Sequence, residues 1–230
     1  MSVLHTTSEA PPVPETRELL AALLAAYSRG EPGSPPGSVA IVGNAPVDPD
    51  PGRAAAVDGA DLVIRMTSFA VDTDDRAPAL GRRTDVVMLH RGLVASPHTF
   101  TDYTSRLYLL VEPGRLHWEP ETLPDWWPAD LGFLPVPNRE FTLPLNRLLG
   151  FPATAATWST TGTLTAYLVT ELFPDARVLM TGMSIIDQPE QTSFAHAWGA
   201  AVDVTAEHRL AAEASLLRRW VHDGRIEVIP

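Results

Sequence analysis

The hydrophobic pattern of the chain alternates between short apolar runs and longer segments whose apolar residues recur at helical spacing. The apolar runs predict strands at residues 38–43, 61–66, 84–90, 106–112, 176–183 and 225–230. The helical pattern predicts helices at residues 52–60, 160–173 and 206–222. Apolar strands that alternate with helices are typical of an α/β fold, in which a mostly parallel sheet is flanked by helices. Because such folds bind ligands at the carboxyl ends of the strands, the residues that follow each strand are the first candidates for a site.

The first 37 residues have a different pattern from the rest. Residues 1–13 are expected to lack regular structure. Pro14 begins a predicted helix, and its apolar stripe consists of Leu19, Leu20, Leu23, Leu24 and Tyr27. Gly and Pro residues at 30–37 then form a linker, so this helix is expected to pack onto the domain that follows. We predict a tail, helix and linker at 1–37 and a single domain at 38–230.

The middle of the chain, residues 113–152, is rich in proline and contains Trp118, Trp126 and Trp127. This composition predicts a long irregular region that lies over a site. Packing is the favoured role of the three tryptophans, and stacking on a sugar ring is the alternative.

Composition excludes several classes of function. The chain has no Cys, which excludes a disulfide framework and a thiolate zinc site. All 17 basic residues are Arg, so no lysine Schiff base and no P-loop lysine is possible. The net charge of -11 argues against non-specific nucleic-acid binding. No apolar run is long enough to span a membrane, and the first residues lack a secretory signal, so we expect a cytoplasmic location.

The first candidate site follows the strand at 38–43, where the sequence continues as Gly43-Asn44. A dinucleotide-binding loop is not indicated, because VGNAPVDPDPG lacks the second and third glycines of that motif. The amide of Asn44 offers a donor and an acceptor, and it can hold a sugar hydroxyl or a base edge. On this stretch alone, the favoured alternative is that Asn44 only shapes a turn.

The second candidate is the start of the helix at 160–173, which reads Ser159-Thr160-Thr161-Gly162. Hydroxyl groups and free backbone N–H groups at a helix start can bind phosphate. An ordinary helix cap explains the same residues equally well.

The third candidate is a pair of histidines, His196 and His208. A histidine at a helix start can act as a base near neutral pH, although packing or surface roles are commoner. Glu213 lies five residues after His208, which does not match the spacing of a helical metal pair, so zinc is not indicated.

An alternative metal site is Asp72-Thr73-Asp74. An Asp-x-Asp motif can bind a divalent cation and the diphosphate of a nucleotide sugar. The surrounding charged stretch DTDDR favours a solvated loop instead.

Taken in order, these motifs resemble those of the sialyltransferases of glycosyltransferase family 29. The long motif of that family is matched by AIVGN at 40–44, DLVIRM at 61–66 and GRRT at 81–84. The short motif is matched by TTG at 160–162, followed by a strand that ends in TGM at 181–183. The third motif corresponds to the segment His196-Ala197-Trp198, and the last, His-x4-Glu, to His208 and Glu213. The resemblance covers residues 38–230 and is to a soluble, bacterial-type relative.

The resemblance implies a variant of the GT-A nucleotide-binding fold and a glycosyltransferase-like catalytic domain. The implied reaction is an inverting, metal-independent transfer of sialic acid, or a related sugar such as Kdo, from a CMP-sugar to an acceptor hydroxyl. The implied partners are the CMP-sugar donor and a glycan or small-molecule acceptor, with no nucleic acid, no membrane span, no bound metal and no further cofactor. His208 would be the base, and His196 would assist departure of CMP. Donor-binding positions would be Gly43, Asn44, Thr67, Ser159, Thr160, Thr161, Gly162 and Gly182, with Glu213 and Arg65 as supporting residues.

The sequence departs from the family pattern at three points. Thr67 stands where the family has a second Asn, Met183 replaces an aromatic residue after Gly182, and the absence of Cys removes the disulfide of secretory-pathway members. Two alternatives therefore remain. One is a metal-dependent transferase of another nucleotide sugar that uses Asp72 and Asp74, and the other is a non-catalytic nucleotide-binding protein that keeps the fold.

Overall fold

The computed structural model describes residues 14–92, 94–112, 125–152 and 156–230. The expected tail at 1–13 and Trp118 lie outside the described residues.

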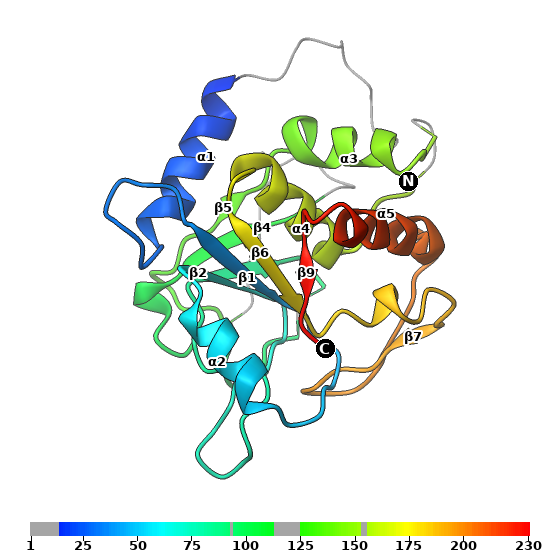
Figure 1. The fold of residues 1–230 in the computed structure, drawn as a ribbon. Coiled ribbons are helices and arrows are strands. Elements are labelled where there is room, and N and C mark those ends of the chain that lie inside the picture. Colours follow the sequence, from blue (N-terminus) through cyan, green and yellow to red (C-terminus); the bar gives the residue numbers. More distant parts are fainter. Residues whose placement is uncertain (1–13, 93, 113–124, 153–155) are drawn as a thin grey trace.

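Within these residues, seven strands form one parallel sheet with the order β5-β4-β3-β2-β1-β6-β9 (Figure 1). From β1 the chain adds β2 to β5 on one side, and it then returns to place β6 and β9 on the other side of β1. The boundary between β1 and β6 is therefore a topological switch point, where open α/β sheets bind ligands. The strands are β1 (Ser38–Val42), β2 (Leu62–Met66), β3 (Val86–Leu89), β4 (Leu107–Leu110), β5 (Leu134–Pro135), β6 (Arg177–Thr181) and β9 (Glu227–Val228).

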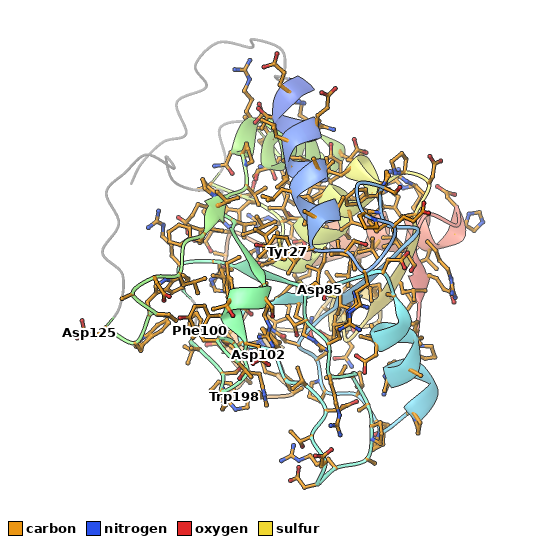
Figure 2. The ribbon with its side chains drawn as sticks, turned by 90° about the vertical axis from the view of Figure 1, so that its left-hand side faces the viewer. Tyr27, Asp85, Phe100, Asp102, Asp125 and Trp198 are labelled. Carbon is orange, nitrogen blue, oxygen red and sulfur yellow. The ribbon has the colours of Figure 1, made fainter. Side chains whose placement is uncertain are left out.

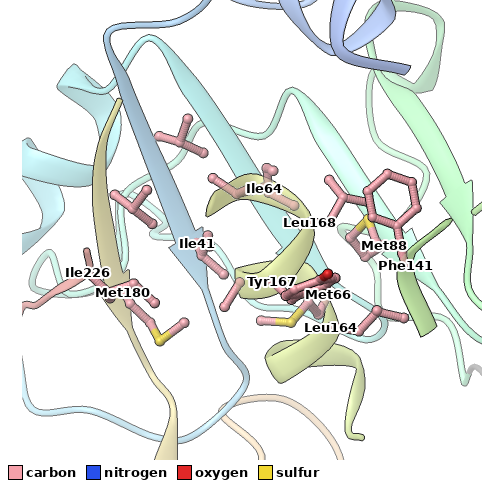
Figure 3. Packing of buried hydrophobic residues seen from close by; sticks show 14 of the residues in the cluster. Ile41, Ile64, Met66, Met88, Phe141, Leu164, Tyr167, Leu168, Met180 and Ile226 are labelled. Carbon is pink, nitrogen blue, oxygen red and sulfur yellow. The ribbon is translucent and has the colours of Figure 1, made fainter. Parts of the chain in front are cut away.

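Helices cover both faces of the sheet. The larger core packs alternate strand residues against the helices on one face, and Figure 3 shows Ile41, Ile64 and Met88 facing Leu168 of α4. The smaller core on the other face packs Ala40, Val42 and Val63 against α2. The helices are α1 (Pro14–Ala26), α2 (Pro51–Gly59), α3 (Leu143–Leu148), α4 (Thr161–Leu172) and α5 (Leu210–His222), with 3₁₀ turns at Tyr103–Ser105 and Ser184–Ile186.

The predicted α/β fold with a mostly parallel sheet flanked by helices is confirmed, and so are the predicted strands, apart from at most two residues at either end. Helix α1 packs onto the domain as predicted, because its apolar stripe buries Leu24 in the larger core. Helix α5 begins at Leu210 rather than at residue 206, so His208 lies in the turn before the helix.

The prediction of an irregular region was wrong for part of residues 125–152. Besides the two-residue strand β5, this segment forms a π-helical turn at Asn138–Thr142 that continues into α3. Phe141 and Leu145 lie four residues apart on one helical face, and both are completely buried in the larger core. Pro144 conceals this helix in the sequence; it is the second residue of α3 and follows directly on the π-helical turn.

Trp126 and Trp127 belong to an aromatic cluster that covers the sheet near β4. The ring centroids of Phe100 and Trp127 are 5.2 Å apart, and those of Trp127 and Phe133 are 5.6 Å apart. The indole N–H of Trp127 donates to the carbonyl oxygen of Leu131 at 2.8 Å. Figure 2 shows Phe100 and Asp125 on this side of the molecule. Trp127 therefore packs, as the favoured interpretation stated, whereas half of Trp126 remains exposed.

Arg65 is a buried anchor of the loop that follows β2. Its guanidinium donates to four backbone carbonyl oxygens, those of Ala70, Leu80, Gly81 and Arg83, at 2.8 to 3.1 Å. Burial lowers the pKa of Arg65 to about 10, with Asp58 and Asp72 raising it in opposition. The side chain is therefore charged at neutral pH, and its charge is offset by carbonyl dipoles and nearby carboxylates.

We expect Arg65→Gln to lower the free energy of unfolding by about 2–4 kcal/mol, because several buried carbonyl oxygens lose their donors. Denaturant unfolding measures this change. Arg76→Gln, in an exposed loop, is the matched control and should change stability by less than about 0.5 kcal/mol. Equal stabilities of the two variants would contradict an anchoring role for Arg65.

Candidate active site

A cavity of about 600 Å³ opens at the switch point of the sheet. The residues after β1, β2, β3 and β6 form its floor, and the start of α4 forms one wall. A two-stranded antiparallel hairpin, β7 (Ser193–Phe194) and β8 (Val202–Asp203), forms another wall (Figure 1, below α5). Trp198, in the loop of this hairpin, is labelled in Figure 2 and lines the cavity. Of the predicted site residues, the cavity brings together Gly43, Asn44, Thr67, Thr160, Thr161, Gly162, Gly182, His196 and His208.

The floor of the cavity depends on two glycines that let β1 and β6 touch. The N–H of Gly43 donates to the carbonyl oxygen of Thr181, and the N–H of Ala45 donates to that of Gly182, at 2.8 and 3.0 Å. A Cβ atom on Gly43 would lie 2.1 Å from the carbonyl oxygen of Gly182, where no side chain fits. Gly182 itself has φ +66, a left-handed conformation that glycine adopts without strain.

Asn44 joins the ends of β1 and β2. Its Nδ2 donates to the carbonyl oxygen of Met66 at 2.9 Å and to Oγ1 of Thr67 at 2.8 Å, while its buried Oδ1 has no partner among the residues that the structure describes. These bonds hold Thr67 at φ +50, which is uncommon for a residue with a branched side chain. Because Thr67 Oγ1 accepts from Asn44, its own hydroxyl hydrogen remains available to the cavity. Asn44 thus shapes the site and presents Thr67; direct contact of Asn44 with a nucleotide stays a prediction.

The start of α4 combines the two alternatives left open by the sequence. Thr160 caps the helix, since its Oγ1 accepts from the N–H of Thr163 at 3.4 Å. Thr161 and Gly162 follow in the cavity wall, and the first N–H groups of a helix have no acceptor within the helix. A Cβ atom on Gly162 would lie 2.3 Å from Cε of Met183, so the Met183 side chain would have to move to admit a larger residue.

Glu213 on α5 positions the start of α4 through hydrogen bonds to Thr160. It is completely buried on α5, and its Oε2 accepts from the N–H and the hydroxyl of Thr160 at 2.8 and 2.7 Å. Glu213 therefore supports the start of α4. Ser159 is buried beside Thr160, and neither Ser159, Glu213 nor Arg65 lines the cavity.

Among the described residues, three histidines line the cavity. Nδ1 of His208 lies 3.1 Å from the carbonyl oxygen of Trp158, an atom that only accepts, so Nδ1 carries the proton and Nε2 keeps a lone pair in the neutral ring. His196 is half-buried in the hairpin loop, and burial lowers its pKa. Its loop is tied to the end of β1, because the N–H of Ala197 donates to the carbonyl oxygen of Asn44 at 2.7 Å.

The third histidine, His90, was not among the predicted site residues. Burial is the main cause that lowers the pKa of His90, and the proximity of His208 and His196 lowers this pKa further. The sequence could have identified His90 by the argument that identified Asn44, because His90 ends the predicted strand at 84–90 and ligands bind at the carboxyl ends of strands.

The carboxylates of the alternative metal motif lie outside the cavity lining. Both oxygens of Asp72 accept backbone N–H groups, from Ala79, Leu80 and Gly81 at 2.7 to 2.9 Å, and Asp74 pairs with Arg82 on the surface. The part of the chain that the structure describes contains no group of three or more His, Asp or Glu residues placed to hold a metal ion.

Within the described residues, no helix has the length and apolar character needed to cross a membrane.

No protein-family model and no curated protein matches the chain. Solved structures do: a mammalian sialyltransferase in complex with Gal-beta-1-3GalNAc-ortho-nitrophenol matches with a TM-score of 0.51 and 14% identity, over 96% of this chain and 81% of its own. A second structure of a mammalian sialyltransferase matches with the same score and identity and covers 80% of its own chain. The likeness shows that this chain has a sialyltransferase-like fold.

Lowered histidine pKa values predict how stability depends on pH. The unfolded chain binds protons at these rings near the ordinary pKa of 6.5, whereas the folded protein resists protonation of His90 and His196. The contribution of these rings to the free energy of unfolding is therefore highest above pH 6.5. It falls as the pH drops below 6.5, because the unfolded chain gains protons that the folded protein does not. We expect melting temperatures between about pH 7.5 and pH 5.5 to fall less in a His90→Gln, His196→Gln double variant than in the wild type. His222→Gln, at an exposed ring, is the control; an unchanged slope in the double variant would contradict the prediction.

Proposed function

We propose that this protein is a glycosyltransferase that transfers sialic acid, or a related sugar, from a CMP-sugar to a hydroxyl of a glycan or small-molecule acceptor. The observation that carries the proposal is the convergence of the α4 start with His196 and His208 in one cavity at the switch point of the sheet. The sialyltransferase-like fold supports it, as does the disaccharide glycoside bound by one of the similar structures.

The donor end of the site is formed by the α4 start and the β1–β2 edge. The N–H groups of Thr161 and Gly162 lie at the positive end of a helix, which favours a phosphate group. The hydroxyl of Thr67 adds a donor from the floor, and His196 adds a ring that can donate a hydrogen bond or a proton to the departing CMP. Donors placed where the phosphate gains charge lower the barrier to its departure.

His208 is the base in the proposed reaction. Its ring is oriented by the carbonyl oxygen of Trp158, which directs the proton to Nδ1 and leaves Nε2 to accept the acceptor's hydroxyl proton. Attack of the resulting oxygen on the face opposite CMP inverts the anomeric centre. The bond from the sugar to the phosphate oxygen breaks as the new glycosidic bond forms, and CMP leaves with the bonding electrons.

A donor screen tests the proposal. CMP is expected to raise the melting temperature, and CMP-sialic acid or CMP-Kdo is expected to release CMP when an acceptor sugar is present. His208→Ala should lower the transfer rate by about 10²- to 10⁴-fold without loss of CMP binding, because a general base contributes about that much. His222→Ala is the exposed control. CMP binding without transfer would favour the non-catalytic alternative, and no response to CMP would refute the proposed donor.

Metal independence is proposed because helix N–H groups and histidines lie where a cation would otherwise bind the phosphate. We expect transfer to continue at an unchanged rate in excess EDTA, and Asp74→Asn to have no effect. A loss of activity that added Mg²⁺ or Mn²⁺ restores would favour the metal-dependent alternative.

A further inference from the structure

His90 occupies the end of β3 in the floor of the cavity, and the proposed reaction leaves it without a role. The carboxyl ends of three adjacent strands carry a polar side chain each, Asn44 after β1, Thr67 after β2 and His90 after β3. Asn44 and Thr67 bind each other, and among the described residues His90 has a hydrogen bond only at Nδ1. Its second ring nitrogen, Nε2, therefore has no protein partner in the described part of the chain.

The bond at Nδ1 determines which tautomer His90 adopts. The N–H of Gly92 donates to Nδ1 at 3.1 Å, so Nδ1 must present a lone pair. The neutral ring then carries its proton on Nε2. A second proton on Nδ1 would oppose the N–H of Gly92 and break this bond, and burial together with the two neighbouring histidines lowers the pKa of the ring in the same direction. His90 is thus a neutral donor whose one available lone pair, on Nδ1, already accepts from Gly92, whereas the lone pair of His208 lies on Nε2.

The position of His90 separates it from the donor end of the site. The α4 start packs against the ends of β2 and β6, since a Cβ atom on Gly162 would meet Met66 and Met183. His90 lies at β3, two strands from the switch point. His208 and His196 line the same cavity as His90. Because His90 lies at the end of β3, away from the β1–β6 junction, we assign its ring to the acceptor side of the cavity in the proposed reaction.

We propose that His90 is an acceptor-binding residue, whose Nε2–H donates a hydrogen bond to an oxygen of the acceptor sugar beside the hydroxyl that His208 deprotonates. This inference rests on the proposed function. A fixed neutral donor selects a group with a lone pair, such as a hydroxyl or ring oxygen, and it holds that group without competing for the proton that His208 removes.

Three substitutions at residue 90 test the proposal with CMP-sialic acid and Gal-β-1,3-GalNAc-ortho-nitrophenol. His90→Ala should lower kcat/KM for the acceptor by about 3- to 10-fold, the usual effect of one neutral hydrogen bond, with KM for the donor unchanged. His90→Gln places an amide N–H near the position of Nε2 and should restore most of the activity, whereas His90→Asn, which reaches only the position of Nδ1, should not. His98→Gln is the matched control, because His98 is half-buried after the same strand and lies outside the cavity lining. Equal acceptor kinetics in all variants would overturn the proposal.

Nitrogen-15 NMR of labelled histidines gives a readout that does not need turnover. We expect His90, assigned from the spectrum of His90→Gln, to carry its proton on Nε2 between about pH 6 and pH 8, and its Nε2 signal to move when the disaccharide glycoside is added to the CMP complex. Protonation at Nδ1, or movement with CMP and not with the disaccharide, would overturn the acceptor role, as would no movement at all. A wild type that transfers no sugar refutes the proposed function, and this titration then decides on His90 separately.

Discussion

The close approach of β1 and β6 is the constraint on which the site depends. Gly43 and Gly182 bring the two backbones into direct contact, and any side chain at Gly43 would collide with a carbonyl oxygen. The chain reverses its direction of strand addition at this boundary, so the floor of the cavity and the switch point of the sheet coincide. The start of α4 sits on the same contact, because Gly162 packs on Met183 directly after β6. The junction of β1 and β6 therefore fixes the place of the α4 N-terminus at the edge of the cavity.

The polar residues around this junction mostly bind one another. Asn44 holds Thr67, Glu213 holds Thr160, and Arg65 gathers the carbonyl oxygens of the loop after β2. Asn44 and Glu213 each hold a threonine that lines the cavity, and the hydroxyl hydrogen of Thr67 remains available there. This arrangement provides preorganisation, since the donors are aligned before a ligand arrives and need little rearrangement when charge develops.

Two of the cavity histidines differ in tautomer because they differ in backbone partner. His208 meets a carbonyl oxygen and therefore carries its proton on Nδ1, whereas His90 meets an N–H group and carries it on Nε2. Identical side chains thus face the cavity as an acceptor and as a donor. In the proposed reaction, histidines and helix N–H groups bind the negatively charged donor in a chain that has no lysine and a net charge of -11.

The sequence by itself determined six strands of the large sheet, four helices and their order, because apolar periodicity reflects which residues a sheet and its helices bury. It also placed Gly43, Asn44, Thr161, Gly162, His196 and His208 as candidates, since each follows a strand, begins a helix or matches a motif. Only the tertiary structure decided that Asn44 binds Thr67, that Glu213 supports α4, and that His90 joins the site. The helical segment at 138–148 also became evident only in the structure, because Pro144 conceals it in the sequence while packing of Phe141 and Leu145 stabilises it. Contacts between residues far apart in the chain leave no local pattern, and the roles of these residues depend on such contacts.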